Sequence, residues 1–182
     1  MRLALSFFIT CLFLPFTLFA KTVEDSFLKG DRESIIYQIE SFDKKDKPKN
    51  IILLIGDGMG MNHITLSRMA IGGDNYQLAL DQMPHIGTST TQSSNDLITD
   101  SAAAATTWAT GKKTKNKYLS MTPDKEPLQT ITELLSKRGY LTGVVATSSV
   151  THATPAAFFS HVDSRYKTKE IASQLLSSSI DV

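Results

Sequence analysis

The stretch Leu97-Ile98-Thr99-Asp100-Ser101-Ala102-Ala103-Ala104-Ala105-Thr106 decides the expected fold and chemistry of this chain. Serine is a preferred N-cap residue and alanine is the best helix former, so we predict a helix that begins at or just after Ser101 and stops at Gly111. A hydroxyl at a helix N-terminus lies where anions such as phosphate are stabilised. The alanines also allow close packing against a sheet. A plain capped surface helix is the simpler reading of this stretch alone.

Two continuous apolar runs, 51–55 and 141–147, predict strands that are buried on both faces of a parallel sheet. A third strand is expected at 87–92, where threonine is abundant. Together with the predicted helices, these strands indicate an α/β fold with a mainly parallel sheet that helices cover on both faces. The helices are expected within 22–42, after Gly60, from Ser101, from Pro127 to Gly139 and after Tyr166.

Candidate site residues follow the two longer strands, where ligands bind in open α/β sheets. Asp57 lies between glycines and supplies a hard oxygen ligand for a metal. A dinucleotide-binding loop is the alternative for this segment, although its glycine spacing is not the full fingerprint and a carboxylate would repel pyrophosphate.

Three further residues have a functional and a structural interpretation. His152 and Thr154 are two positions apart, so in an extended segment their side chains would point to the same side. A purely structural role for both stays open. Arg165 can hold two phosphate oxygens with its guanidinium group, or it can form a surface ion pair.

The first twenty residues have the pattern of a secretory signal peptide. Met1 and Arg2 precede an uncharged apolar run that ends at Ala20, which predicts cleavage after Ala20 and a periplasmic or secreted protein. A membrane anchor is the alternative, but Pro15 and the short run argue against a stable one. We therefore divide the sequence into a signal peptide (1–20), an N-terminal helical arm with a linker (21–48) and one portion of an α/β domain (49–182).

The charge balance argues against a nucleic-acid-binding protein. Removal of residues 1–20 takes away Arg2 and no acidic residue, which leaves 18 basic against 18 acidic residues. A nucleic-acid binder needs a dense basic surface to neutralise phosphates. The same cleavage removes Cys11, the only cysteine of the sequence, so no disulfide is expected.

Taken together, these motifs resemble those of the alkaline phosphatase family, from about Lys49 to the last residue. The resemblance implies a doubly wound α/β fold, two zinc ions, one magnesium ion, secretion and homodimerisation. It also implies hydrolysis of phosphate monoesters through a phosphoserine. The motifs that carry it are Asp57, the Asp100–Thr106 segment, His152-x-Thr154 and Arg165.

The resemblance also implies a role for each candidate residue. Ser101 would be the nucleophile and would contact a metal, and Arg165 would bind the substrate phosphate. Asp57 would bridge the second zinc and the magnesium, and Thr154 would ligate magnesium. His152 matches a position where family members carry aspartate or histidine, and it would reach magnesium through water.

Most zinc ligands of the family come from a later half, as an Asp-x-x-x-His pair, an Asp-His pair and a further histidine. None of these has a fitting counterpart among the four histidines of this sequence. We therefore expect the N-terminal part of an alkaline phosphatase, with a sheet that is incomplete at the C-terminus, little metal binding and no activity alone. A secreted, non-catalytic remnant that binds phosphate or a partner is the alternative.

Overall fold

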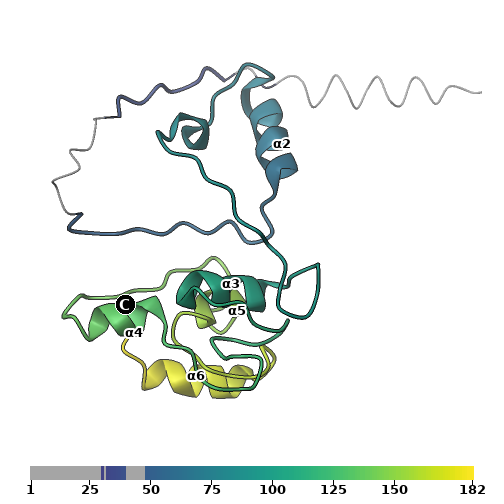
Figure 1. Ribbon diagram of the computed structural model, residues 1–182. Helices are drawn as coiled ribbons and strands as arrows, with labels where there is room; N and C mark the ends of the chain where they lie inside the picture. The colour runs from purple at the N-terminus through teal and green to yellow at the C-terminus, as the bar shows by residue number, and fades with distance from the viewer. Residues whose placement is uncertain (1–29, 31, 40–47) are drawn as a thin grey trace, which may run out of the picture. The chain divides into compact units, whose positions relative to one another are not determined.

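The computed structural model describes residues 30, 32–39 and 48–182, and the predicted signal peptide therefore lies outside the described residues. The chain separates into two compact units (Figure 1). The second unit consists of Ile55–Gly58 and Gly87–Val182, and the first contains the other described residues, 30, 32–39, 48–54 and 59–86. No helix within the described residues is long and apolar enough to cross a bilayer.

The first unit contains the helix α2 (Met61–Gly72) and the short 3₁₀ helix η1 (Ala79–Gln82). The helix that the sequence predicts after Gly60 is thus confirmed. It ends where Gly73 adopts a positive φ of 85°, which glycine tolerates without a steric penalty. Arg68 of α2 donates two hydrogen bonds to the carboxylate of Asp81, at 2.9 and 2.6 Å, and so ties the two elements together.

The helix predicted within 22–42 is wrong for residues 32–39, which form no helix. Their backbone groups bond to other segments instead. Gln82 donates from Nε2 to the carbonyl of Ile35 at 2.8 Å, and its Oε1 accepts from the N–H of Tyr37 at 2.8 Å. These contacts occupy backbone groups that a helix would use internally. The rest of that predicted helix, apart from Gly30, lies outside the described residues.

The second unit contains four helices among its described residues: α3 (Ser101–Thr110), α4 (Ile131–Ser136), α5 (Ala153–Ala156) and α6 (Thr168–Leu176). The predicted start and end of α3 are confirmed. The helix begins at Ser101 and ends before Gly111, which has a left-handed φ of 71°. Asp100 rather than Ser101 is the N-cap residue: its carboxylate accepts from the N–H of Ala103 at 3.0 Å. Ser101 is therefore the first helical residue.

The helix expected from Pro127 begins later than predicted. α4 starts at Ile131 behind the N-cap residue Thr130, whose hydroxyl accepts from the N–H of Glu133. The carboxylate of Glu133 accepts in turn from the N–H of Thr130 at 2.9 Å, which completes a capping box. This reciprocal pair fixes the helix start more strongly than the proline does.

The core of the second unit forms where small residues let two helices approach. Ala102 and Ala105 of α3 pack with Ala153 and Ala156 of α5, and all four are almost completely buried. Figure 1 shows these helices side by side. The close packing that the alanines predict is therefore present, but against a helix instead of a sheet. The other core members are Leu119, Ala157, Phe159, Val162 and Ile171.

The predicted buried strands are wrong for the residues that the structure describes. Segments 51–55, 87–92 and 141–147 form no strand, and Ile52 and Val145 are 83% and 92% exposed. Within the described ranges the only bridges are isolated ones, Leu119–Val162 and Met121–Pro127. A strand requires a paired neighbour, and an apolar run alone does not supply one.

One strand-like pairing is nevertheless present at the second predicted strand. The N–H of Val144 donates to the carbonyl of Val182 at 2.9 Å, and the N–H of Val182 donates to the carbonyl of Thr142 at 3.3 Å. Bonds that flank one residue in this way are those of a parallel pair. The segment 141–147 therefore runs parallel to its partner at Val182, as expected for a strand of a parallel sheet. The described residues nevertheless form no parallel sheet.

An ion-pair cluster joins α6 to the loop before α4. The carboxylate of Asp163 lies 2.8 Å from Nζ of Lys125 and 2.7 Å from Nζ of Lys167. Hydrogen bonds from Lys125 and then from Lys167 lower the pKa of Asp163 to about 2.

A first prediction concerns Ile171, a residue of α6 whose side chain is completely buried in the core. Ile171→Ala should lower the free energy of unfolding by about 2–5 kcal/mol, because it removes buried methylene groups and leaves a cavity. Leu176→Ala is the matched control, since Leu176 is in the same helix and is 91% exposed. Urea denaturation of both variants checks this. Equal losses in the two variants would contradict the packing of α6 described here.

A second prediction concerns the pH dependence of stability. The pKa of Asp163 is lower in the folded chain than its ordinary value of 3.8, so its ion pairs stabilise the fold above that value and are lost as the pH falls toward about 2. Asp163→Asn should therefore flatten the fall in unfolding free energy across this range. Asp124→Asn, in the exposed loop that carries Lys125, is the control and should leave the slope as in the parent chain.

Candidate active site

A carboxylate and two hydroxyls from distant parts of the chain meet in the second unit. Oδ1 of Asp57 accepts a hydrogen bond from Oγ of Ser101 at 2.8 Å, and its Oδ2 accepts one from Oγ1 of Thr154 at 2.8 Å. Ser101 is the first residue of α3 and Thr154 lies in α5, so the packing of these two helices brings the hydroxyls together. Each hydroxyl occupies a different oxygen of the same carboxylate.

The surroundings of Asp57 keep its carboxyl group ionised. The hydrogen bond from Ser101 is the main cause that lowers the pKa of Asp57. Partial burial opposes this effect, whereas the bond from Thr154 and the nearby His152 and Arg165 add to it. A carboxylate of lowered pKa holds and orients a hydroxyl well, but it is a weak base toward the hydroxyl proton.

Arg165 is held beside this group by a second acid. Its Nη1 donates to Oδ2 of Asp100 at 3.2 Å, and its Nη2 lies 3.3 Å from Nε2 of His152. A guanidinium group has only donors, so Nε2 of His152 is the acceptor in this contact. The side chain of Arg165 is only 17% exposed. Its planar fork is thus oriented by contacts from both helix starts.

The structure brings all five sequence-predicted site residues into one unit. Asp57, Ser101 and Thr154 form one hydrogen-bonded group, and Arg165 contacts His152 next to it. The expected extended conformation around His152 and Thr154 is wrong: His152 is the N-cap residue of α5, and Thr154 lies within that helix. Proline after Thr154 suits the first turn of a helix, which is the signal that points to this outcome.

Sequence reasoning missed the residues that hold the start of α3 in place. Asp100 is the N-cap residue of α3, and its Oδ2 accepts from both Arg165 and the N–H of Lys117, the latter at 3.0 Å. Oδ1 of Asn116 accepts from the N–H of Asp100 at 3.1 Å. An aspartate before a predicted helix is a capping signal, but no local signal identifies Asn116 or Lys117.

The donor atoms around Asp57 fit part of a magnesium site. One carboxylate and two hydroxyls are hard oxygen ligands, and Mg²⁺ binds one or two carboxylates while it keeps several waters. A zinc site requires three or four nitrogen, oxygen or sulfur ligands. Among residues 30, 32–39 and 48–182, no group of three or more His, Cys, Asp or Glu side chains is placed to hold a metal ion. The described residues therefore do not make a zinc site.

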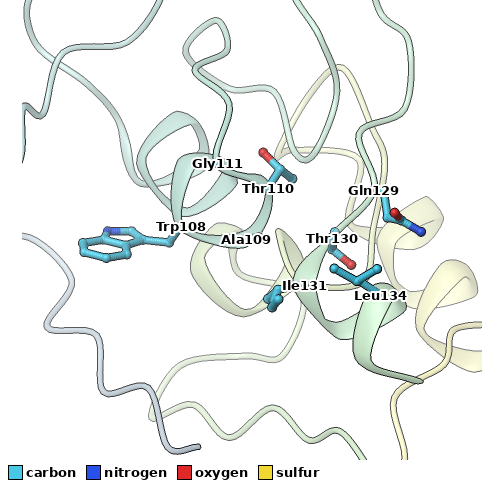
Figure 2. A pocket seen from close by; sticks show the side chains of 8 residues that line it. All are labelled: Trp108, Ala109, Thr110, Gly111, Gln129, Thr130, Ile131 and Leu134. Carbon is cyan, nitrogen blue, oxygen red and sulfur yellow. The ribbon is translucent and has the colours of Figure 1, made fainter. Parts of the chain in front are cut away.

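A shallow pocket lies at the other end of α3 (Figure 2). It is formed between the last turn of α3 and the start of α4, and the half-exposed indole of Trp108 stands at one side of it. The pocket thus faces the C-terminal end of α3 and the N-terminal end of α4, whose dipoles have opposite signs, so the helix ends do not identify it as an anion site. Its lining residues are Trp108, Ala109, Thr110, Gly111, Gln129, Thr130, Ile131 and Leu134.

Curated proteins similar to this chain include phosphatases from fungi and bacteria. The alkaline phosphatase of Schizosaccharomyces pombe is 41% identical over 70% of this chain and 24% of its own length. That of Escherichia coli K12 is 44% identical over 66% of this chain and 27% of its own. The streptomycin-6-phosphate phosphatase of Streptomyces griseus is 45% identical over 64% and 27%, respectively. The chain thus spans about a quarter of the length of these relatives.

The described structure also matches the fold of solved alkaline phosphatases. A mutant of the alkaline phosphatase from the Antarctic bacterium TAB5, in which glutamate replaces a histidine and Mg is bound in the M3 site, is 39% identical with a TM-score of 0.69. The match covers 74% of this chain and 38% of that one. A cold-active alkaline phosphatase from Shewanella sp. is 36% identical with a TM-score of 0.64, over 68% and 32%.

The sequence profile of one family agrees with both comparisons. It is the profile described as alkaline phosphatase, and it matches residues 48–180, which include Asp57, Ser101, Thr154 and Arg165. Because this match extends over most of the chain, the protein belongs to the alkaline phosphatase family.

Proposed function

We propose that this chain carries the nucleophile and the phosphate-binding arginine of an alkaline phosphatase that hydrolyses phosphate monoesters through a phosphoserine. The observation that supports this most directly is the position of Ser101. Its hydroxyl lies at the N-terminus of α3 and is oriented by the Asp57 carboxylate, whose other oxygen holds Thr154. A simple N-cap on a surface helix does not require a carboxylate that also binds a second hydroxyl. Here Asp57 binds the hydroxyl of Thr154, which is 97 positions away in the sequence.

Phosphate would bind where two sources of positive potential meet. The first N–H groups of a helix lack intrahelical partners, and the dipole of α3 places its positive end at Ser101. Arg165 supplies a guanidinium fork, which Asp100 and His152 orient. During attack on phosphorus, charge develops on the equatorial oxygens, and these groups would stabilise it without reorganisation.

Ser101 is the proposed nucleophile, and its proton needs an acceptor stronger than Asp57. The lowered pKa of Asp57 suits it to orient the hydroxyl and not to deprotonate it. By the resemblance, Asp57 and Thr154 would ligate magnesium and His152 would reach it through water. Asp57 would also contact the second zinc, and Ser101 would contact a metal. A divalent cation bound at these oxygens would lower the pKa of the serine hydroxyl. The magnesium in the TAB5 enzyme supports a cation of this kind in the family.

Two properties of the whole protein remain proposals. The pattern of residues 1–20 supports export to the periplasm or the medium. Homodimerisation follows only from family membership.

The absence of a zinc ligand group within the described residues favours a second candidate, a secreted remnant that binds phosphate without hydrolysing it. Both candidates use the α3 N-terminus and Arg165 in the same way. They differ in whether Ser101 becomes phosphorylated.

We expect the purified 182-residue chain to show no hydrolysis of an aryl phosphate, even with added zinc and magnesium, because the described residues cannot assemble a zinc site. Release of the coloured phenolate, followed spectrophotometrically against a buffer blank, measures this. Turnover well above the blank that a chelator removes would contradict the expected inactivity.

In the complete enzyme proposed here, Ser101→Ala should abolish the phosphoenzyme, because it removes the hydroxyl that is proposed to accept the phosphoryl group. Acid quenching after incubation with radiolabelled phosphate measures the covalent label. Ser173→Ala, on the exposed side of α6, is the matched control and should keep full labelling. Undiminished label in the Ser101→Ala protein would remove Ser101 from its proposed role.

A further inference from the structure

Asn116 clamps the backbone directly before the proposed nucleophile. Its Oδ1 accepts from the N–H of Asp100 at 3.1 Å, and its Nδ2 donates to the carbonyl of Ile98 at 2.9 Å. The N–H of Asn116 itself donates to Oδ1 of Asn95 at 2.9 Å. One amide side chain thus fixes both ends of the turn that leads into α3. The loop that carries Asn116 is therefore part of the support of Ser101.

The next residue, Lys117, connects this turn to the arginine. Its N–H donates to Oδ2 of Asp100 at 3.0 Å, and its carbonyl accepts from the N–H of Arg165 at 2.7 Å. The same oxygen of Asp100 also accepts from the guanidinium of Arg165. Asp100 and Arg165 are therefore joined twice, once directly and once through the backbone of Lys117.

Lys117 makes these contacts from an unfavourable backbone conformation. Its φ is 75°, in the left-handed region that residues with a β-carbon seldom occupy. Such a conformation persists only where the surroundings determine it. A residue restricted to negative φ would turn its N–H away from Asp100 or its carbonyl away from Arg165.

We propose that the backbone of Lys117, braced by the Asn116 side chain, is a positioning element that holds Arg165 in register with Ser101. This rests on the proposed roles of those two residues. Asp100 links the parts, because one of its oxygens caps α3 and the other receives Lys117 and Arg165. Small displacements of such groups have large effects on phosphoryl chemistry, which depends on positioning. The lysine ammonium group has no part in this role.

Three substitutions at position 117 separate backbone from charge. Lys117→Val adds a β-branch, which makes positive φ very unfavourable. Lys117→Met removes the ammonium group but keeps an unbranched side chain, and Lys117→Gly relieves the strain. Lys125, in the same loop, has a φ of 69° and contacts Asp163 instead of Asp100. Lys125→Val, compared with Lys125→Met, therefore controls for strain elsewhere in the loop.

The readouts are the ¹⁵Nε–¹Hε NMR signal of Arg165 in the 182-residue chain and its affinity for inorganic phosphate from calorimetric titration. Lys117→Val should shift the Arg165 signal and weaken phosphate binding several-fold, whereas Lys117→Met, Lys117→Gly and both Lys125 variants should change neither. Should Lys117→Val fail to fold, Asn116→Ala provides the second test: it removes the brace, and the Arg165 signal should shift in the same direction.

The outcomes separate this inference from the proposed function. An unchanged Arg165 signal in a folded Lys117→Val or Asn116→Ala chain would overturn the positioning role. A loss of phosphate affinity in Lys117→Met equal to that in Lys117→Val would assign the effect to charge and would overturn it as well. Absence of phosphate binding in the unsubstituted chain would count against the proposed phosphate site, while the Arg165 signal would still decide the role of Lys117.

Discussion

The hydrogen bonds from two hydroxyls to the Asp57 carboxylate are the constraint on which the site depends. They require the first turn of α3 and the short α5 to lie against each other. The alanines of both helices permit this, because no larger side chain separates the two backbones. The alanines of α3 and α5 therefore allow the two hydroxyls to reach the same carboxylate. The core and the candidate site are built on the same pair of helices.

Two acidic residues near the α3–α5 contact have different partners. Asp57 remains ionised between hydroxyls, and Asp100 balances Arg165 while it caps α3. Each acid thus has a separate task, although both lie near the same helix start. An arginine held by one acid and one imidazole keeps donors available for a further anion, which is consistent with a phosphate site.

The sequence predicted the helices better than the strands, and the reason is physical. Gly73 and Gly111 end helices through their own backbone conformations, and Asp100 caps α3 through a neighbour three residues away, so these signals are local. The segments 51–55 and 141–147 needed partner strands, which no local pattern guarantees. The motifs named the candidate site residues, and the structure brings these together. The contact from Asn116 has no such local signal, because it reaches Asp100 across 16 residues.

The exposed apolar segments also affect how the chain behaves in solution. Ile52, Leu54, Leu141 and Val145 are exposed to solvent, and the N–H and C=O groups of 51–54 have no backbone partner among the described residues. Such segments are templates for β-pairing between molecules. A formal net charge of +1 provides little repulsion against it. Concentration, more than ionic strength, will therefore govern whether preparations of this chain remain monodisperse.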